Sequence, residues 1–309
     1  MARIVVCEFM DERAVAQMAA DNDVLYDPAL VDDPAALAAV AAEADALIVR
    51  NRTQVRGDLL AALHRCKVVG RLGVGLDNID VDRCAARGIT VIAATGANAL
   101  AVAEYVITAA LLLLRGAYLS SAEVAAGGWP RSALGNGREA HGKTLGLVGF
   151  GSIGRLTAGL ARAIALRVIA SDPLLDGADP AFRTAGAEAV SLDELVARAD
   201  VVSLHVPLSA STRHLFDAAR IAAMRPGAVL INTSRGAIVD EAALAAALTS
   251  GRLGGAALDV FEVEPPGAGN VLATCPNLLL TPHIAGVTVE SNERVSFLIA
   301  DKVTEALAR

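Results

Sequence analysis

Short runs of apolar, often β-branched residues alternate with stretches of helical periodicity along almost the whole chain. In the first third, five such runs predict strands, at Ile4–Cys7, Val24–Tyr26, Ala46–Arg50, Val68–Arg71 and Thr90–Ala93. Helical patterns lie between them, for example at Pro34–Ala44 and Val81–Arg87. Strands separated by helices are typical of βαβ units, so this part of the chain predicts a parallel sheet.

The pattern changes near residue 98, where a long apolar helix is predicted at Asn98–Arg115, followed by a glycine-rich loop that ends at Gly142. A second βα series then predicts strands at Leu145–Val148, Val168–Ala170, Val201–Leu204, Val229–Asn232, Ala256–Asp259 and Leu278–Leu280. A last helix is predicted at Val289–Ala308. We interpret the long helix as a crossover between two parallel-sheet α/β domains. The pattern leaves open whether the last helix packs on the second domain or returns to the first.

Composition limits the class of protein. The 309 residues are 54% hydrophobic, which is enough for two cores, and the net charge is −7. Nucleic acids and anionic membranes normally bind basic surfaces, so neither partner is expected. The most apolar run, Val102–Leu114, contains Glu104 and is shorter than the roughly 20 residues that span a bilayer.

Four scattered cysteines, Cys7, Cys66, Cys84 and Cys275, form no zinc-binding pattern with each other or with histidines. No metal site is expected. The start of the chain looks like a first strand rather than an export signal. We therefore expect a cytoplasmic protein whose thiols are reduced.

A dinucleotide-binding fingerprint lies at the start of the second series. Gly149, Gly151 and Gly154 fit G-x-G-x-x-G between a predicted strand and a helix. Their roles would be the tight turn, backbone approach to a pyrophosphate and close helix packing. Asp172 ends the next strand, 18 positions after Gly154, where it would accept hydrogen bonds from the adenosine ribose and repel a 2′-phosphate. The alternative, a glycine turn followed by a solvated aspartate, explains less of this context.

Three polar residues follow strands of the second series, namely Arg235, Glu264 and His283. Ligands of open α/β sheets bind at that edge. Oxidation of an alcohol to a ketone needs a base such as histidine, a carboxylate would orient its ring, and a guanidinium binds a substrate carboxylate with two prongs. Taken singly, the three could instead be a surface ion-pair partner, a loop charge and a strand-end cap.

From about Arg50 to Ala285 the chain resembles the D-isomer-specific 2-hydroxyacid dehydrogenase family. The segments that carry the resemblance are Gly73–Asp80, Gly149–Asp172, Asn232–Gly236, Ala257–Pro265 and Thr281–Gly286. The resemblance implies two doubly wound parallel-sheet domains. A Rossmann NAD-binding domain would span residues 98–285. A flavodoxin-like substrate domain would be discontinuous, over residues 1–97 and 286–309, because the last helix returns to the first domain in this family.

The resemblance also implies roles. Arg235 would anchor substrate, His283 would be the acid/base and Glu264 its partner, while Val74 and Gly75 would present N–H groups to the substrate carboxylate. Asp259 would hold the nicotinamide carboxamide. The NAD-binding set would be Gly149, Gly151, Ser152, Ile153, Gly154, Asp172, His205, Pro207, Thr212, Thr233, Asp259 and Ala285. The long helix would lie in a homodimer interface, with Trp129 a weaker candidate for the neighbouring subunit's site. Formate dehydrogenases carry glutamine in place of Glu264, which disfavours formate.

Substrate choice is expected in the first domain, where Arg50 and Arg71 close two strands and Arg52 lies nearby. They are either solvated loop charges or a pocket for a second anionic group on a small 2-hydroxy acid. Phosphoglycerate dehydrogenases look similar around Arg50 and Arg71, whereas the segment after His283 looks more like sulfolactate dehydrogenases. The alternatives are a glyoxylate or hydroxypyruvate reductase and a non-catalytic NAD-sensing protein. His64, His141 and His214 have no motif context and are expected to be solvated or packing residues.

Overall fold

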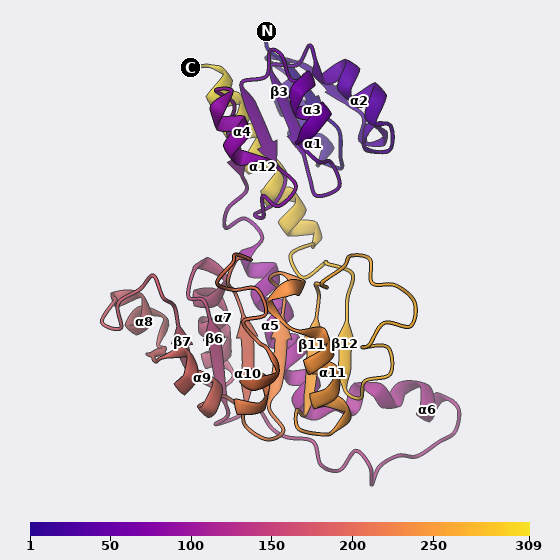
Figure 1. Cartoon of the computed structure of the whole chain (residues 1–309), viewed down its shortest axis with the longest axis vertical. Helices are drawn as coiled ribbons and strands as arrows, with labels where there is room; N and C mark the ends of the chain where they lie inside the picture. Colours follow the sequence, from indigo (N-terminus) through magenta and orange to yellow (C-terminus); the bar gives the residue numbers. More distant parts are fainter. The chain divides into compact units, whose positions relative to one another are not determined.

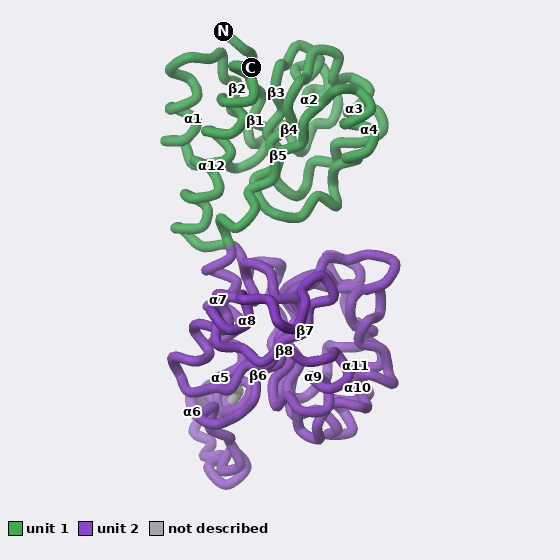
Figure 2. The backbone as a smooth tube through the Cα atoms, turned by 90° about the vertical axis from the view of Figure 1, so that its left-hand side faces the viewer, with its two compact units in different colours: residues 1–98, 287–309 green, residues 99–286 purple. Residues whose placement is uncertain are grey.

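The computed structural model describes every residue of the chain except Leu119. The chain folds as two compact units (Figure 2). Unit 1 consists of Met1–Asn98 with Val287–Arg309, and unit 2 of Ala99–Gly286. Among the described residues, no helix is long and apolar enough to span a bilayer.

Unit 1 is built on a five-stranded parallel sheet in the order β2-β1-β3-β4-β5. This is the flavodoxin-like order, in which the strand order reverses between β1 and β3. The strands are β1 (Arg3–Val6), β2 (Asp23–Tyr26), β3 (Ala46–Val49), β4 (Val68–Arg71) and β5 (Thr90–Ala93). The helices are α1 (Glu12–Ala19), η1 (Pro28–Asp32), α2 (Pro34–Ala41), α3 (Gly57–Ala62), α4 (Val81–Ala86) and α12 (Val289–Leu307).

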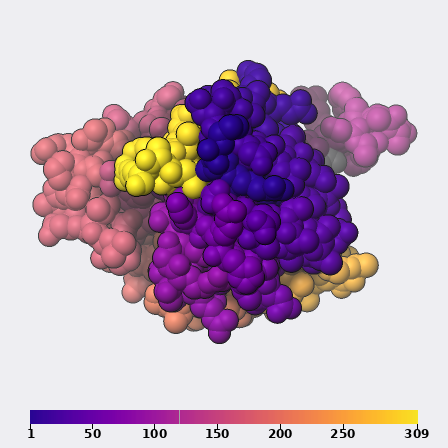
Figure 3. Space-filling model, turned by 90° about the horizontal axis from the view of Figure 1, so that it is seen from above, coloured from indigo at the N-terminus to yellow at the C-terminus, as the bar shows by residue number. Residues whose placement is uncertain are grey.

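The last helix, α12, packs on the sheet of unit 1, next to α1 and against β4. Figure 1 labels α12 in this unit, and Figure 3 shows the end of the chain, in yellow, beside the N-terminal residues, in indigo. Its apolar stripe of Val295, Ile299 and Val303 is buried in the same cluster as Ile4 of β1. Gly70 of β4 makes the approach possible, because a Cβ there would lie 2.8 Å from Val303 and 2.9 Å from Ile299. The end of the chain thus completes the core that its beginning started.

Unit 2 is built on a seven-stranded parallel sheet in the order β12-β11-β10-β9-β6-β7-β8. This is the Rossmann order with one further strand at the edge, and it reverses between β6 and β9. The strands are β6 (Thr144–Val148), β7 (Arg167–Ser171), β8 (Glu188–Ala189), β9 (Val201–Leu204), β10 (Val229–Asn232), β11 (Gly255–Leu258) and β12 (Leu278–Leu280). The helices are α5 (Ala99–Arg115), η2 (Ala117–Ser120), α6 (Ser121–Ala125), α7 (Ser152–Ala163), α8 (Pro180–Ala185), α9 (Leu192–Arg198), α10 (Ala218–Ala223), η3 (Gly236–Ile238) and α11 (Glu241–Thr249).

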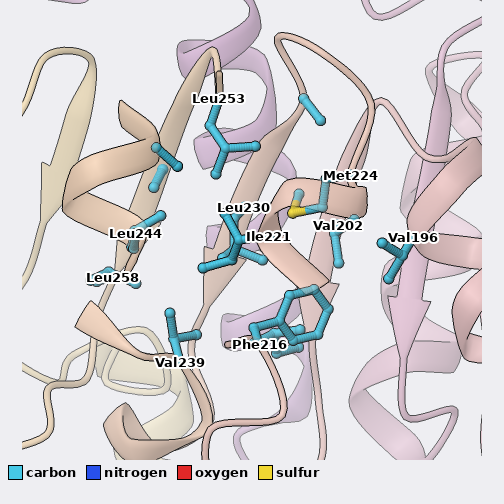
Figure 4. Packing of buried hydrophobic residues seen from close by; sticks show 14 of the residues in the cluster. Val196, Val202, Phe216, Ile221, Met224, Leu230, Val239, Leu244, Leu253 and Leu258 are labelled. Carbon is cyan, nitrogen blue, oxygen red and sulfur yellow. The ribbon is translucent and has the colours of Figure 1, made fainter. Parts of the chain in front are cut away.

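The central strands of unit 2 are buried on both faces. Val201 and Val229 belong to one hydrophobic cluster, with α5 and α7, whereas the next residues along the strands, Val202 and Leu230, belong to another. Figure 4 shows the second cluster, in which Phe216 and Leu244 pack against the sheet. Burial on both faces explains why these strands are continuous apolar runs in the sequence. The predicted fold class of two doubly wound parallel sheets is confirmed.

Candidate active site

The glycine loop lies at the carboxyl end of β6, beside β9, where the sheet of unit 2 reverses its order. Gly149 has φ +95°, and a Cβ there would lie 2.5 Å from the carbonyl oxygen of His205. A Cβ on Gly154 would lie 2.5 Å from the carbonyl oxygen of Gly149. Around Gly151, in contrast, a Cβ would meet nothing within 4 Å. The loop is therefore closely packed at Gly149 and Gly154 and open at Gly151, where a pyrophosphate can approach the backbone.

Helix α7 begins at this loop with its first amides available. Its N-cap is Gly151, and no side chain caps the helix. Ser152 and Ile153 form the first helical positions. The N-terminus of a 12-residue helix presents free N–H groups and a partial positive charge, which together favour a phosphate.

Asp172 ties the end of β7 to the glycine loop. One carboxylate oxygen accepts a hydrogen bond from Phe150 N at 2.7 Å, and the other accepts from Leu174 N at 2.9 Å. Each oxygen retains capacity for another donor, since a carboxylate has about four acceptor positions. Asp172 can therefore hold the loop and still accept from ribose hydroxyls.

Two further predicted NAD-binding residues carry buried polar atoms without a partner in the described part of the chain. These are both ring nitrogens of His205 and the hydroxyl of Thr233. Burial lowers the pKa of His205 to about 4, so its ring is neutral at pH 7. Nearby, the Thr212 hydroxyl donates to the carbonyl of Pro207 at 2.6 Å and closes the turn after β9. The open glycine loop, the uncapped helix and these unpaired polar atoms fit a bound dinucleotide.

The three predicted catalytic residues follow β10, β11 and β12, which are neighbours in the sheet. Asn232, at the end of β10, shapes the arginine loop: its amide donates to the carbonyl of Arg235 at 2.9 Å and accepts from Ser234 N at 3.0 Å. A Cβ on Gly236 would lie 1.8 Å from the carbonyl carbon of Phe261, so only glycine fits there. This contact brings the loop of Arg235 against the loop that leads to Glu264.

Glu264 and His283 form a direct pair. One carboxylate oxygen of Glu264 lies 2.8 Å from Nδ1 of His283, and the other accepts from Phe261 N at 3.0 Å. A carboxylate partner places the hydrogen on Nδ1, so Nε2 is the nitrogen that can exchange a proton with substrate. Both side chains remain partly exposed.

Asp259 is buried and holds the histidine loop. Its carboxylate accepts from the Thr281 hydroxyl at 2.6 Å and from the amides of Ile284 and Ala285 at 2.8 Å. His283 N donates to the carbonyl of Asp259 at 2.8 Å. The Tyr105 hydroxyl lies 2.6 Å from that of Thr281 and extends the network to α5. The positioning roles of Asn232, Thr281 and Tyr105 were not predicted from sequence. Asn232 and Thr281 begin segments that carry the family resemblance, but no role was assigned to them.

The predicted substrate-binding residues Arg50, Arg71, Val74 and Gly75 belong to unit 1. Arg50 donates to the side-chain oxygen of Asn292 at 2.7 Å, and Arg71 donates to the carbonyl of Leu72 at 3.2 Å. Arg52 forms an exposed ion pair with Asp32. Within the described residues, the amides of Val74 and Gly75 donate to no backbone acceptor, and no cluster of metal-ligating side chains occurs.

A doubly wound sheet that carries a dinucleotide fingerprint at its switch point and a carboxylate–histidine pair at neighbouring strand ends defines a nicotinamide-dependent dehydrogenase. Comparison with known proteins specifies the family. Residues 107–285 match the D-isomer specific 2-hydroxyacid dehydrogenase, NAD binding domain. The chain is 54% identical to the (S)-sulfolactate dehydrogenase of Chromohalobacter salexigens over 307 residues, 99% of each protein. It is 40% identical to the hydroxypyruvate reductase of Thermotoga maritima, over 86% of this chain and 85% of that protein.

A glyoxylate reductase from Paecilomyes thermophila has the same fold, with a TM-score of 0.86 and 30% identity over 100% of this chain and 96% of that one. The chain belongs to the D-isomer-specific 2-hydroxyacid dehydrogenase family. It is an NAD-dependent enzyme that acts on a 2-hydroxy acid, which sets aside the alternative of a non-catalytic NAD-sensing protein.

Proposed function

We propose that the enzyme interconverts a 2-hydroxy acid that bears a second anionic group at C3 with the corresponding 2-keto acid. Sulfolactate and 3-sulfopyruvate are the favoured pair. The observation that carries this proposal is the 54% identity over the full length to an (S)-sulfolactate dehydrogenase. Arg50, which follows β3 at the switch point of unit 1, is the group that we propose binds the second anion.

The proposed chemistry divides between named residues. When bound, NAD would supply the hydride chemistry at C2, as acceptor in oxidation and as donor in reduction. Arg235 binds the C1 carboxylate by charge-assisted hydrogen bonds. His283 takes the hydroxyl proton on Nε2 during oxidation and returns it to the carbonyl oxygen during reduction. Glu264 fixes the tautomer through Nδ1 and stabilises the charged ring.

The family's D specificity agrees with the (S) descriptor of the relative. In D-lactate the carboxylate outranks the methyl group, and the centre is named (R). In sulfolactate the sulfur-bearing carbon outranks the carboxylate, so the same spatial arrangement is named (S). An enzyme with the family's D specificity at C2 would therefore produce (S)-sulfolactate.

Hydroxypyruvate or glyoxylate reduction is the second candidate, favoured by the 40% identity to a hydroxypyruvate reductase. Neither keto acid has a second anion. Turnover of NADH with 3-sulfopyruvate, 3-phosphohydroxypyruvate, hydroxypyruvate and glyoxylate, compared as kcat/KM, separates the two. We expect 3-sulfopyruvate to exceed glyoxylate by at least tenfold, the factor that about 1.4 kcal/mol of binding provides. Equal values would favour the reductase.

Arg50→Ala should reduce kcat/KM for 3-sulfopyruvate about 10- to 150-fold, because a charge-assisted hydrogen bond is worth about 1.5–3 kcal/mol. Glyoxylate reduction should change little, since glyoxylate has no distal group. Arg71→Ala tests the other arginine in the same way, and Arg52→Ala, whose side chain pairs with Asp32, should have the smaller effect. Equal losses on both substrates in Arg50→Ala and Arg71→Ala would return these residues to the role of loop charges.

A homodimer and a cytoplasmic location stay predictions. Helix α5 exposes Leu100 and Leu111, and Trp129 is 77% exposed, which is consistent with apolar surface covered by a second copy. Light scattering of the purified protein, with Leu111→Glu as the interface variant, would test the dimer.

A further inference from the structure

Two loops of unit 1 meet at the point where its strand order reverses. Glu8 and Phe9 come after β1, separated from it by Cys7, and residues 50–53 directly follow β3. Strands β1 and β3 are hydrogen-bonded neighbours, and β2 lies on the other side of β1. Doubly wound sheets bind ligands outside the carboxyl ends of their strands at such a point.

Glu8 is a buried carboxylate, only 4% exposed, that binds the second loop by its backbone. One of its oxygens accepts from Arg50 N at 2.8 Å and Thr53 N at 3.0 Å, and the other accepts from Asn51 N at 3.3 Å and Arg52 N at 3.1 Å. Burying a carboxylate is costly unless its acceptor positions are used, and here four consecutive amides use them.

These contacts restrict the loop to one backbone conformation. Four consecutive N–H groups can point at one carboxylate only if the chain curls around it, as in an anion-binding nest. Asn78, also buried, supports the loop by donating to the carbonyl of Thr53 at 2.7 Å. The Cα of Arg50 is therefore held in place independently of its side chain.

Phe9, the residue after Glu8, contacts the guanidinium of Arg50. The ring centroid of Phe9 lies 5.5 Å from the guanidinium carbon of Arg50, within cation–π range, and Asn292 accepts from the same guanidinium at 2.7 Å. Partial burial lowers the pKa of Arg50. A guanidinium that has lost part of its hydration gains more from an anionic partner than a fully solvated one does.

We propose that Glu8 and Phe9 are positioning residues that present the Arg50 guanidinium to the anion at C3 of the substrate. Glu8 fixes the backbone of residues 50–53, and Phe9 fixes the guanidinium. This inference rests on the proposed function, in which Arg50 binds the second anion. Neither residue is proposed to touch the reacting atoms.

Phe9→Leu is the sharper test. Phe9 is 52% exposed, so a leucine there leaves the core and the four Glu8 hydrogen bonds intact. We expect kcat/KM for 3-sulfopyruvate to fall about 3- to 10-fold, the range of a partly desolvated cation–π contact, mainly through KM. The kcat/KM for glyoxylate should change by less than about twofold, because glyoxylate has no anionic group at C3 for Arg50 to bind.

Glu8→Gln and Glu8→Ala test the backbone contact. Glutamine keeps one of the two acceptor oxygens. Glu8→Gln should therefore reduce kcat/KM for 3-sulfopyruvate, relative to glyoxylate, less than Glu8→Ala does. Asp45→Ala is the matched control, because the Asp45 carboxylate accepts from Arg3 N at 2.8 Å at the opposite, amino end of the same two strands. Asp45→Ala should lower the melting temperature without changing the ratio of kcat/KM for 3-sulfopyruvate to kcat/KM for glyoxylate.

The outcomes separate the two proposals. Equal losses on both substrates in Phe9→Leu and Glu8→Gln, in an enzyme whose preference for 3-sulfopyruvate depends on Arg50, would overturn this inference alone. A Glu8→Ala variant that behaves like Asp45→Ala would do the same. A wild-type enzyme with no preference for 3-sulfopyruvate over glyoxylate would overturn the proposed substrate class, and this inference with it.

Discussion

His283 has a backbone conformation that is unfavourable for its residue type. Its φ of +58° is in the left-handed region, which costs a non-glycine residue about 1–3 kcal/mol. The buried Asp259 compensates, since it accepts from the two amides that follow His283 and its carbonyl accepts from His283 N. The imidazole is therefore aimed at Glu264 by the backbone as well as by its own hydrogen bond.

Replacement of His283 by Ala should lower kcat about 10²- to 10⁴-fold, the usual contribution of one positioned acid/base, with NADH affinity unchanged.

Glu264→Gln should shift the pH optimum of keto-acid reduction to lower pH, because reduction starts from the charged imidazole and the variant removes the negative partner that stabilises it. Profiles of kcat/KM against pH measure this. An unchanged profile in Glu264→Gln would contradict the assigned role.

The buried, neutral His205 should make the stability of unit 2 sensitive to acid. Burial lowers its pKa from 6.5 to about 4, so well above pH 6.5 it is neutral in both the folded and the unfolded chain and does not affect stability. Between pH 6.5 and 4 the unfolded chain binds the proton first, and the free energy of unfolding should fall, by about 2 kcal/mol at pH 5. Urea unfolding without NADH should show a flatter pH dependence in His205→Gln than in wild type. Parallel curves would exclude His205 as the source.

At the scale of elements, alanine substitutions at two glycines of α7 should have opposite effects. Gly154→Ala places a Cβ 2.5 Å from the carbonyl oxygen of Gly149, so the loop must open and NADH should bind at least about tenfold more weakly. Gly159, on the same helix, has nothing within 4 Å of its Cβ position. Gly159→Ala should stabilise the protein by about 0.5–1 kcal/mol and leave NADH binding unchanged. Calorimetric NADH titration and thermal unfolding of both variants would check this, and equal binding by both would contradict it.

The elements that sequence predicted best are those whose signal is local. The central strands are continuous apolar runs, and the glycine loop is specified within a few residues. The strand β8 was missed, because it has only two residues and lies at the edge of the sheet, so it leaves no apolar run in the sequence.

The parts of the site that depend on distant partners could not be predicted. Glu8 binds amides 42 or more positions along the chain, and Asn232 acts through a loop whose packing on Phe261 appears only in three dimensions. The candidate catalytic residues Arg235, Glu264 and His283 were predicted because their residue types and strand-end positions recur in the family. The contacts that hold them in place join loops far apart in the sequence, so they appear only in the folded chain.

On the scale of the whole molecule, the chain closes on itself: α12 fills the core of unit 1 after the chain has built all of unit 2. Unit 1 cannot bury Ile4 and Gly70 fully until the last helix is present, so its stability should depend on residues almost 300 positions from its first strand. Unit 2 has its own two clusters, and α12 belongs to neither.

Ile299→Ala should therefore destabilise unit 1 selectively. Ile299 is fully buried in α12, and truncation of a buried isoleucine to alanine costs about 2–5 kcal/mol. Hydrogen exchange measured by mass spectrometry should show faster exchange in residues 1–98 and 287–309, with residues 99–286 unchanged. Lys302→Ala, an exposed position on the same helix, is the matched control and should leave both units as in wild type. Faster exchange throughout the chain in Ile299→Ala would instead mean that the two units unfold as one cooperative body, and that α12 stabilises the whole molecule rather than the sheet on which it packs.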